Sequence, residues 1–419
     1  METTVCLVDC ENFYVSCERA FRPDLWRRPV VVLSNNDGCV ISRSNEVRAT
    51  GVGMAVPYFQ VREQLEAMGA EVFSSNYALY ADMSRRVMNL LEKAAAELAV
   101  YSIDEAFLRF PAMGPHELEE TGRQVRRRVR RATGIPVRFG FGRTKTLAKL
   151  ASAKAEEEPD GVYALPGGEV QEEVLATFPV EDVWGIGRQR TKLLHEYGVK
   201  TARELRDLPD YWVRRRMTVT GLRTVWELRG TECLPLDEAP TNRKSLVRSR
   251  SFGRKVYAKQ ELAEAVAART ARAAEKLREE RLVGRGMQVF ITTRHYGRGP
   301  HYANACSAEL PRPTNFTPEL TKAAKELLGR IYREGYGYKK AGVMLFDLSA
   351  EVPEQGHLFL ESDPREQALM AACDRINEKM GRGTVHLAAA GVRRAWEMQR
   401  RRKSPCYTTR WKELPVVLA

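Results

Sequence analysis

The sequence predicts a multidomain α+β protein, and three observations carry that prediction. A chain of 419 residues is too long for one compact core and suggests two to four domains. Short apolar runs at 5–8 and 29–33, bounded by turn-forming residues, indicate buried strands. From 245 to 349, strand and helix patterns follow one another in the order β-α-β-β-α-β, which is typical of a four-stranded sheet with helices on one face.

The remaining elements follow in chain order. Residues 137–142 alternate Val, Phe and Phe with Arg, Gly and Gly, which predicts a strand, and a helix with an apolar side follows near 147–151. Residues 170–232 predict helices joined by short connections. In the β-α-β-β-α-β region we expect strands at 245–252, 287–291, 302–310 and 341–348, and helices at 261–280 and 318–333.

The charge of the chain is concentrated in one region. The formal net charge is +13, and residues 241–300 contain 15 Lys or Arg against 5 Asp or Glu, a local excess of 15 − 5 = +10. A solvated helix face usually balances its signs, so this concentration favours a surface that binds a polyanion, most often a nucleic acid. The total charge alone leaves a merely basic soluble enzyme open.

Cysteine and hydropathy patterns bear on location. The eight cysteines form no CxxC pair, and the six histidines are not spaced to complete a zinc site with them, so reduced thiols in a cytosolic protein are expected. Asp9 and Glu11 interrupt the first apolar run, which excludes a signal peptide, and no apolar run reaches the length that crosses a bilayer. We therefore expect a cytoplasmic protein with no membrane partner; a nucleoid-associated location follows only from the family resemblance described below.

Three carboxylates stand at strand-like positions. Asp9 ends the first apolar run, and Asp104 and Glu105 lie between apolar neighbours. Adjacent side chains of a regular strand point to opposite faces, so one acid of this pair would enter a core, which is costly without a cation. A strand end or bulge that aims both acids at a metal resolves the conflict. Three such acids can hold two Mg²⁺ for in-line phosphoryl transfer. The acids alone also allow an exposed turn at 104–105 and a helix cap at Asp9.

A glycine motif lies within the helical region. Gly185, Ile186 and Gly187 precede a helix, and Gly198 begins a second turn before another helix. This pattern is typical of a helix-hairpin-helix, in which glycines let backbone N–H groups at a helix N-terminus approach a phosphate without reading base sequence. A purely structural helix turn is the alternative.

These motifs together resemble Y-family translesion DNA polymerases, and within them the UmuC type, the catalytic subunits of bacterial DNA polymerase V. Further matches lie in the fingers-like segment 34–41, the palm-like segment 74–84 and the C-terminal extension-like segment 405–411. The resemblance implies a right-hand polymerase. Its parts are a ferredoxin-like palm at 1–20 and 78–166, small fingers at 21–77, a helix-hairpin-helix thumb at 167–232, a β-α-β-β-α-β little finger at 243–349, and a tail at 350–419.

The resemblance also implies an active site. Two Mg²⁺, with Mn²⁺ as an alternative ion, would be held by Asp9, Asp104, Glu105 and the backbone carbonyl of Cys10. Tyr14 falls on the steric gate, whose ring would collide with a ribose 2′-OH, with Phe13 stacked beneath it. The other expected nucleotide contacts are Ser42, Asn45, Arg48 and Lys154.

Two of those positions depart from the family pattern. Asn45 stands where many members have a tyrosine. The palm lysine expected near the triphosphate falls on Glu156, and Lys154 is the nearest substitute. The triphosphate contacts on the palm side are therefore open, whereas the carboxylate assignment is not.

Macromolecular contacts are implied as well. DNA contacts are expected at Gly185, Ile186, Gly187, Arg248, Arg250, Arg254 and Lys255. Gln355, Leu358 and Phe359 resemble the pentapeptide that docks such polymerases on the sliding clamp, although Gly356 replaces the usual leucine. The resemblance suggests UmuD′-like and RecA-like partners without deciding whether they are required.

The function implied is error-prone, template-directed DNA synthesis across lesions, from primer-template DNA and dNTP. Two alternatives stay open. A nucleotidyl cyclase-like enzyme can carry paired carboxylates on a ferredoxin-like palm, but it needs neither the hairpin nor a basic accessory module. A non-catalytic DNA-binding scaffold would use only those two features.

Overall fold

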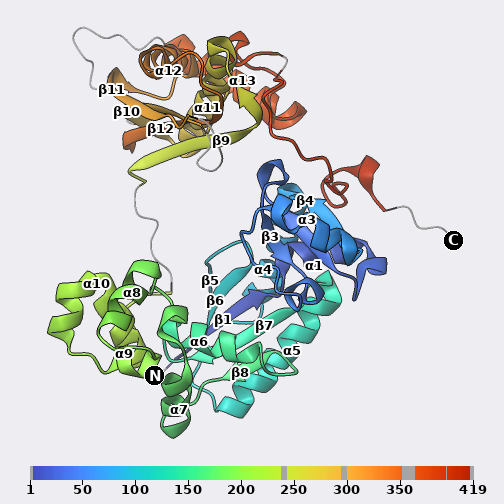
Figure 1. Ribbon diagram of the computed structural model, residues 1–419, viewed down its shortest axis with the longest axis vertical. Coiled ribbons are helices and arrows are strands. Elements are labelled where there is room, and N and C mark those ends of the chain that lie inside the picture. The colour runs from blue at the N-terminus through green and yellow to red at the C-terminus, as the bar shows by residue number, and fades with distance from the viewer. Residues whose placement is uncertain (1–2, 237–242, 294–299, 352–363, 393, 416–419) are drawn as a thin grey trace. The chain divides into compact units, whose positions relative to one another are not determined.

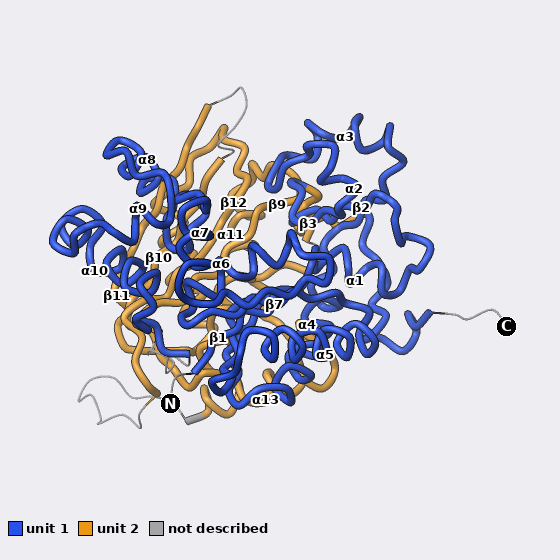
Figure 2. Tube along the Cα trace, turned by 90° about the horizontal axis from the view of Figure 1, so that it is seen from below, with its two compact units in different colours: residues 1–34, 38–240, 402–419 blue, residues 35–37, 241–401 orange. Residues whose placement is uncertain are grey.

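The computed structural model describes residues 3–236, 243–293, 300–351, 364–392 and 394–415 of the chain. Helices and strands alternate through most of it (Figure 1). The chain folds into two compact units, which are coloured separately in Figure 2. Unit 1 comprises residues 1–34, 38–240 and 402–419, and unit 2 comprises residues 35–37 and 241–401.

The palm of unit 1 is built on a five-stranded sheet with the strand order β5-β6-β1-β7-β8. The central strand β1 (Thr4–Cys10) runs antiparallel to β6 (Glu105–Phe110) and to β7 (Val137–Gly142), while β7 and β8 (Val162–Ala164) are parallel. The edge strand β5 (Glu97–Val100) pairs with β6. Strands β6 and β7 are joined by α5 (Pro115–Thr133) and flank β1, so they form a split βαβ unit, as the ferredoxin-like prediction requires.

The two faces of the palm sheet carry different cores. Cys6, Val8 and Cys10 alternate into the main core cluster, which also holds side chains of α4 (Tyr77–Glu92) and α5. Val5 and Leu7 point the other way, toward Ala148 of α6 (Lys145–Ala155). Helix α6 lies so close that a Cβ at Gly140 would collide with the backbone of Ser152. Asp9 follows Val5 and Leu7 in this alternation and so belongs to the α6 face.

The fingers form a small separate layer of unit 1. Their sheet has the order β3-β2-β4, with β2 (Val30–Leu33) antiparallel to β3 (Val40–Arg43) and parallel to β4 (Glu71–Ser74). Helices α2 (Asn45–Arg48) and α3 (Tyr58–Ala67) contribute to its own apolar core. The buried strand predicted at 29–33 is confirmed. Helix α1 (Phe13–Phe21) and the 3₁₀ turn η1 (Pro23–Leu25) lead from β1 into this layer, and η2 (Asn35–Asp37) interrupts it.

The thumb of unit 1 is entirely helical, as predicted. It contains α7 (Glu169–Thr177), η3 (Val180–Asp182), α8 (Arg188–Glu196), α9 (Ala202–Arg206) and α10 (Asp210–Leu228). The two turns of the helical hairpin are tied by backbone hydrogen bonds of 2.9 Å, from the Val180 N–H to Lys200 O and from the Ala202 N–H to Phe178 O. Gly185 has φ +90°, a conformation that favours glycine.

Unit 2 contains the predicted β-α-β-β-α-β module. Its elements are β9 (Ser245–Val256), α11 (Lys259–Glu279), β10 (Leu282–Thr292), β11 (Ala303–Thr314), α12 (Thr317–Ile331) and β12 (Tyr338–Ala350). The strand order is β11-β10-β12-β9, and every neighbouring pair is antiparallel. As in the palm, this is the split βαβ arrangement that the β-α-β-β-α-β order predicts, because β9 and β10 are joined by α11 and flank β12, while β11 and β12 are joined by α12 and flank β10. Helices α11 and α12 pack on each other and share one core with the sheet.

The tail does not form one region. Helix α13 (Pro364–Met380) and the turn η4 (Ala388–Ala390) belong to unit 2, where the Arg278 guanidinium pairs with Asp374 at 2.6 and 2.8 Å. Residues from 402 onward, including η5 (Trp411–Glu413), belong to unit 1. The clamp-like motif at Gln355, Leu358 and Phe359 lies outside the described residues.

Two predicted properties concern the chain as a whole. Among the helices that the structure describes, none combines the length and the apolar character needed to span a membrane. All eight cysteines are free thiols, and four of them, Cys6, Cys10, Cys17 and Cys406, are buried.

Candidate active site

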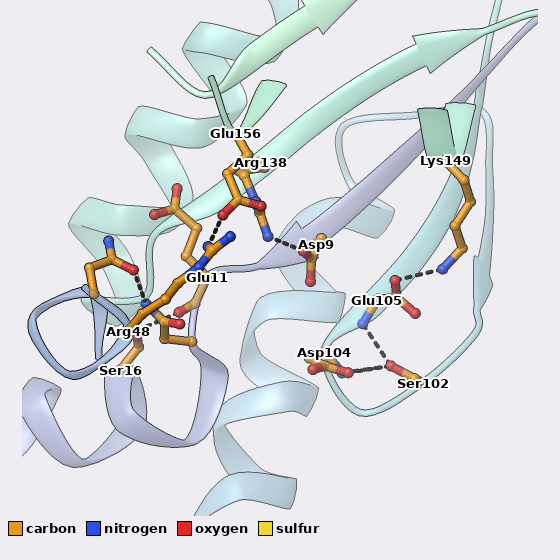
Figure 3. Close-up of polar contacts among 12 residues, drawn as sticks. Asp9, Glu11, Ser16, Arg48, Ser102, Asp104, Glu105, Arg138, Lys149 and Glu156 are labelled. Carbon is orange, nitrogen blue, oxygen red and sulfur yellow. Dashed lines mark hydrogen bonds and ion pairs between the residues drawn. The ribbon is translucent and has the colours of Figure 1, made fainter. Parts of the chain in front are cut away.

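The two predicted acidic segments meet on the palm sheet. Asp9 stands directly opposite Glu105 in the antiparallel register of β1 and β6. On its other side, Asp9 stands opposite Arg138 of β7. Three neighbouring strands therefore present the series Glu105, Asp9, Arg138 on the α6 face, and Figure 3 shows Asp9 between the other two.

Asp104 lies just outside the strand, which explains how both adjacent acids avoid the core. Strand β6 begins at Glu105, so Asp104 occupies the preceding turn. The Ser102 hydroxyl accepts backbone hydrogen bonds from Asp104 N at 3.1 Å and Glu105 N at 3.0 Å, and it donates to the Asp104 carboxylate. The Cys10 N–H donates to Asp104 O at 2.9 Å, which fixes this turn beside the end of β1. The predicted strand end at the acids is confirmed.

Each strand acid is paired with a cation. Arg138 Nη2 donates to Asp9 Oδ2 at 2.6 Å, and Lys149 Nζ on α6 donates to Glu105 Oε1 at 2.6 Å. The Lys149 ammonium also lies 4.7 Å from the centre of the Tyr101 ring. Because buried carboxylates are costly without a partner, these two cations stabilise the acids in the absence of a metal.

The pKa of Asp9 indicates that Arg138 and Lys149 do not fully balance the negative charge of the three carboxylates. Burial raises the pKa of Asp9 to about 6, with Arg138 opposing the rise and the charges of Glu105 and Asp104 adding to it. A carboxylate that is this hard to ionise, next to two other carboxylates, is an environment that a divalent cation would relieve.

The three acids have the right ligand atoms for a hard metal ion, but their side chains are not gathered into a cluster. Within the described ranges, no three His, Cys, Asp or Glu side chains are gathered closely enough to hold a metal ion. Asp9, Glu105 and Asp104 turn toward Arg138, Lys149 and Ser102 respectively. Their donors are nevertheless all carboxylate oxygens from adjacent positions, the ligand type that Mg²⁺ prefers. Ion binding would therefore exchange these protein partners.

A chain of ion pairs extends the site toward the fingers. The Arg138 guanidinium pairs with Glu156 as well as with Asp9, and Glu156 also pairs with Arg48 of α2 (Figure 3). Although burial pushes the pKa of Glu156 upward, the hydrogen bonds from Arg48 and Arg138 bring it below its usual value. The Glu156 carboxylate thus lies between two guanidinium groups and joins Arg48 to Arg138.

Lys154, the expected substitute for the triphosphate lysine, has a partner on the surface, and its role toward a nucleotide stays a prediction. Lys154 is on the last turn of α6, where its ammonium pairs with Glu157 at 3.0 Å. The cations that actually reach the acids are Arg138 and Lys149. At the position where the family spacing predicts the palm lysine, this chain has Glu156. The Glu156 carboxylate forms ion pairs with Arg48 and Arg138.

The ring of Tyr14 stacks on a different residue from the predicted Phe13. Its stacked neighbour is Tyr80 of α4, with ring centres 4.5 Å apart and planes 20° apart. Phe13 is tilted by 49° at 5.7 Å, so the predicted stacking of Phe13 beneath Tyr14 is wrong. Tyr77 meets Tyr14 edge-on at 6.1 Å. Consecutive residues at the start of a helix diverge by about 100°, which prevents parallel stacking of 13 on 14.

Ser42 and Asn45 join the fingers to the start of α1. The Ser42 hydroxyl accepts from Val15 N and donates to Asn12 O, both at 3.3 Å. Asn45 accepts from the Asn12 amide at 2.9 Å. Both predicted nucleotide contacts therefore have structural partners, and their roles toward a nucleotide stay predictions.

The helical hairpin presents an open helix start. Gly187 precedes α8, and nothing lies within 4 Å of a Cβ built there. Ile186 is buried in the thumb core, while Arg188 and Lys192 line a surface cavity of about 890 Å³ at this helix start. Backbone N–H groups at a helix start flanked by cations suit a phosphate.

The basic residues of β9 divide between two environments. Arg248 and Arg250 pair in register with the buried residues Val343 and Ala341, which places them on the helix-covered side of the sheet. Arg250 accordingly lies near Arg269 of α11, whose pKa is lowered to about 10 by burial and by the surrounding arginines. Arg254 and Lys255 are exposed beyond the bulge. Arg248 is half-buried and Arg250 is exposed, and the roles of both toward DNA stay predictions.

Sequence reasoning missed Arg138, Lys149 and Tyr80 as site residues. Arg138 was visible as a charged residue in an otherwise apolar strand next to glycines, a signal that could have been read as a partner for Asp9. Lys149 and Tyr80 gave no such signal, because a lysine or a tyrosine on an amphipathic helix is ordinary.

Family models match three parts of the chain. The "impB/mucB/samB family" matches residues 8–153, the "impB/mucB/samB family C-terminal domain" matches residues 243–358, and a "Domain of unknown function (DUF4113)" matches residues 367–417.

Curated relatives match over nearly the full length. Protein UmuC of Salmonella typhimurium is 43% identical over 97% of this chain and 98% of that protein, and protein SamB of the same organism is 43% identical over 98% of both. DNA polymerase IV of Desulfatibacillum aliphaticivorans is 29% identical over 93% of this chain and 97% of that protein.

Solved structures agree on the fold. A chimera of the Y-family DNA polymerases Dbh and Dpo4 aligns with a TM-score of 0.65 at 20% identity, covering 83% of this chain and 99% of that one. An insertion ternary complex of Dbh DNA polymerase aligns with a TM-score of 0.52 at 19% identity and the same coverage.

Proposed function

The chain belongs to the impB/mucB/samB family, and from this premise we propose that it is an error-prone, template-directed DNA polymerase that extends primers across lesions. The family relation covers the palm and the little finger, and its relatives include enzymes named DNA polymerase. The observation that carries the proposal is the meeting of Asp9, Asp104 and Glu105 at the ends of two neighbouring palm strands.

The reaction joins a dNMP to a primer. The primer 3′-OH loses its proton and attacks the α-phosphate of a dNTP, a new P–O bond forms, and the bond to pyrophosphate breaks. Two Mg²⁺ held by Asp9, Asp104, Glu105 and the Cys10 carbonyl would supply the charge that stabilises the attacking and leaving oxygens. Mn²⁺ would bind the same oxygen donors.

The chain's own cations are arranged to receive the triphosphate. Arg138 Nη2 lies 2.6 Å from Asp9, and both Arg138 and Arg48 hold Glu156. When Asp9 turns to a cation, Arg138 loses one partner, and its Nε already has no hydrogen-bond partner among the described residues although it is buried. Arg48 and Arg138 would then bind phosphate oxygens in place of Glu156, with Arg138 acting instead of the absent palm lysine.

Tyr14 would select the sugar. Its ring is held between Tyr80 on one face and the edge of Tyr77, at the start of the helix that follows the acids. A fixed ring in this place excludes a 2′-OH by steric contact and so favours deoxynucleotides.

DNA would be held by the hairpin and by unit 2. Gly185, Ile186 and Gly187 present backbone N–H groups of α8, and Arg254 and Lys255 supply exposed cations on β9. Such contacts go to phosphates and carry no sequence preference, which suits a polymerase that must accept any template. A sliding clamp and UmuD′-like and RecA-like proteins are further partners that the family relation suggests, and a cytoplasmic, nucleoid-associated location follows from DNA synthesis.

Primer extension by the wild type and by Asp104→Ala tests the proposal. Template-dependent extension should fall by at least about 10³-fold in the variant, because the loss of a metal ligand removes several kcal/mol of transition-state stabilisation. Glu63→Gln, which changes an exposed carboxylate on α3, is the matched control and should leave extension unchanged. A cyclic nucleotide product would identify the cyclase alternative, and DNA binding without turnover the scaffold alternative; either would contradict the proposal.

Arg138 and Lys154 can be separated by steady-state kinetics. Arg138→Ala should raise the KM for dNTP by about tenfold, since one charge-assisted contact to phosphate is lost. Lys154→Ala, which removes a surface ion pair with Glu157, should leave the KM within about twofold. An Arg138→Ala enzyme with an unchanged KM and a lower kcat would instead show that Arg138 acts only through Asp9.

A further inference from the structure

The last described residues of the chain are fastened to the palm and fingers of unit 1. Residues 402–407, which we name the C-terminal anchor, lie against the end of β4. The Ser74 N–H donates to Arg402 O at 2.9 Å, and the Arg402 N–H donates to the Ser74 hydroxyl at 2.9 Å. Tyr407 stacks on Phe21 with ring centres 4.8 Å apart and joins the palm core. These contacts give the anchor a fixed position.

Asn76 holds the middle of the C-terminal anchor. It is fully buried and directly precedes α4. Its amide nitrogen lies 3.1 Å from Ser404 O, 3.0 Å from the Ser404 hydroxyl and 3.1 Å from Pro405 O. Since the Asn76 amide donates to the Ser404 hydroxyl, that hydroxyl keeps its own proton to donate elsewhere.

The Ser404 hydroxyl donates to a buried carboxylate. Its acceptor is Glu18 Oε1 on α1, at 3.0 Å, and the same oxygen accepts from the Tyr80 hydroxyl at 2.7 Å. Glu18 and Tyr80 are both fully buried. Hydrogen bonds to a buried carboxylate are stronger than those between neutral groups, so Glu18 ties Tyr80 firmly to the anchor.

Tyr80 connects Glu18 to Tyr14, the residue that would contact the nucleotide sugar. Its ring stacks on Tyr14 at 4.5 Å and 20°. The ring of Tyr80 cannot slide along α1 without breaking its hydroxyl contact to Glu18. The series Ser404, Glu18, Tyr80 and Tyr14 thus links residues separated by 390 positions along the chain.

We propose that the C-terminal anchor positions the ring of Tyr14 through Glu18 and Tyr80, and thereby sets the discrimination between dNTP and rNTP. The inference rests on the proposed function, in which Tyr14 excludes the 2′-OH. It gives a role to the end of the segment matched by the domain of unknown function. Glu18, Tyr80 and Ser404 are positioning residues, because they act on the nucleotide only through Tyr14.

The test measures kcat/KM for a dNTP and for the matching rNTP in the full chain. Ser404→Ala and Tyr80→Phe each remove one hydrogen bond to Glu18 and leave the Tyr80 ring in place. Each should lower the dNTP-to-rNTP ratio by about tenfold, mainly through a better rNTP reaction, while the dNTP reaction stays within about twofold. Trp411→Ala is the control, since that side chain is 89% exposed and lies outside the anchor, and it should leave the ratio unchanged.

A double variant distinguishes positioning from an independent effect. In the Tyr14→Ala background, Ser404→Ala should lower the ratio no further, because the ring that it positions is gone. A further tenfold loss there would overturn the inference. Tyr80→Phe keeps the test decisive if Ser404→Ala unfolds the anchor.

Failure of the inference and failure of the proposed function give different results. If Tyr14→Ala lowers the ratio but Ser404→Ala and Tyr80→Phe do not, the positioning role is overturned and the steric gate stands. If Tyr14→Ala leaves the ratio unchanged, the gate assignment falls and the inference falls with it. If the wild type extends no primer, the polymerase proposal itself is overturned.

Discussion

The palm and the little finger are both sheets packed with helices, yet they place their charges in opposite ways. The charged side chains that are buried in the described residues are Glu18, Asp82, Lys145 and Glu227, and all four lie in unit 1. The polar side chains buried in the described part of unit 2 are neutral, namely Thr270, Thr293, Thr314, Asn315, Thr317 and Thr321. Unit 1 therefore encloses charged side chains completely, whereas the charged groups of unit 2 that form internal ion pairs, such as Arg278 with Asp374, are half-buried.

The difference in buried charge between the two units fits the roles proposed for them, metal binding in unit 1 and binding of a phosphate backbone in unit 2. The proposed metal ligands need defined positions, and strand register and partners such as Arg138 and Lys149 hold Asp9 and Glu105 in place. A surface that binds a phosphate backbone needs only a high density of exposed cations. The antiparallel strands of unit 2 are long, with 11 to 13 residues, whereas the palm strands have 3 to 7 residues, and Asp9 and Glu105 stand next to an end of β1 and at the start of β6.

The largest expected effect concerns the buried carboxylate Glu18 of unit 1. Burial raises its pKa to about 7 from 4.5, although the hydrogen bonds from Tyr80 and Ser404 and the charges of Lys403 and Arg22 oppose the rise. Between these values the folded protein keeps a proton that the unfolded chain has lost. The free energy of unfolding should therefore fall as the pH rises from about 4.5 to 7, by roughly 3 kcal/mol in total.

Urea unfolding across that pH range checks the Glu18 prediction. Glu18→Gln has no proton to lose, so its free energy of unfolding should lack this part of the pH dependence. If the free energy of unfolding depends on pH equally in the wild type and in Glu18→Gln, Glu18 ionises as it does in the unfolded chain. The buried charges of unit 1 would then not make its stability differ from that of unit 2 in this pH range.

A second prediction concerns Tyr14 of unit 1 and separates nucleotide selection from DNA binding. Tyr14→Ala should admit ribonucleotides and lower the dNTP-to-rNTP ratio by on the order of 100-fold, because a steric clash of about 1–3 kcal/mol is removed. The affinity for primer-template DNA should not change, since the proposed DNA contacts lie in unit 2 and the hairpin. Single-nucleotide incorporation assays measure the ratio, and unchanged discrimination would place the gate elsewhere.

The smallest expected effect concerns unit 2. Changing Arg254 and Lys255 to alanine should weaken duplex binding by about tenfold near physiological salt and reduce the slope of log K against log salt by about 2. Incorporation from the bound complex should keep its wild-type rate. Changing Arg248 and Arg250, on the helix-covered side, is the matched control and should alter the slope less. A wild-type affinity that does not depend on salt would contradict backbone contact by this unit.

The sequence predicted most of the fold because the relevant signals are local. Short apolar runs located β1 and β2, alternation located β7 and strands of unit 2, and the glycines at 185 and 187 located the hairpin. The three candidate acids could be found for the same reason, as Asp9 stands at the end of an apolar run and Asp104 and Glu105 lie between apolar neighbours. Local patterns carry no information on contacts between distant elements, however, and this is why the cations that face the acids, Arg138 and Lys149, were not assigned from the sequence.

The amino-acid sequence by itself determined where the three acids stand along the chain, which segments form helices and strands, and where the positive charge is concentrated. Only the tertiary structure decided which cations face those acids, that Tyr80 and not Phe13 stacks on Tyr14, and that the C-terminal anchor reaches Glu18 from 386 residues away. The physical reason is that secondary structure depends on near neighbours, whereas these contacts depend on strand register and on packing between elements that are distant in sequence.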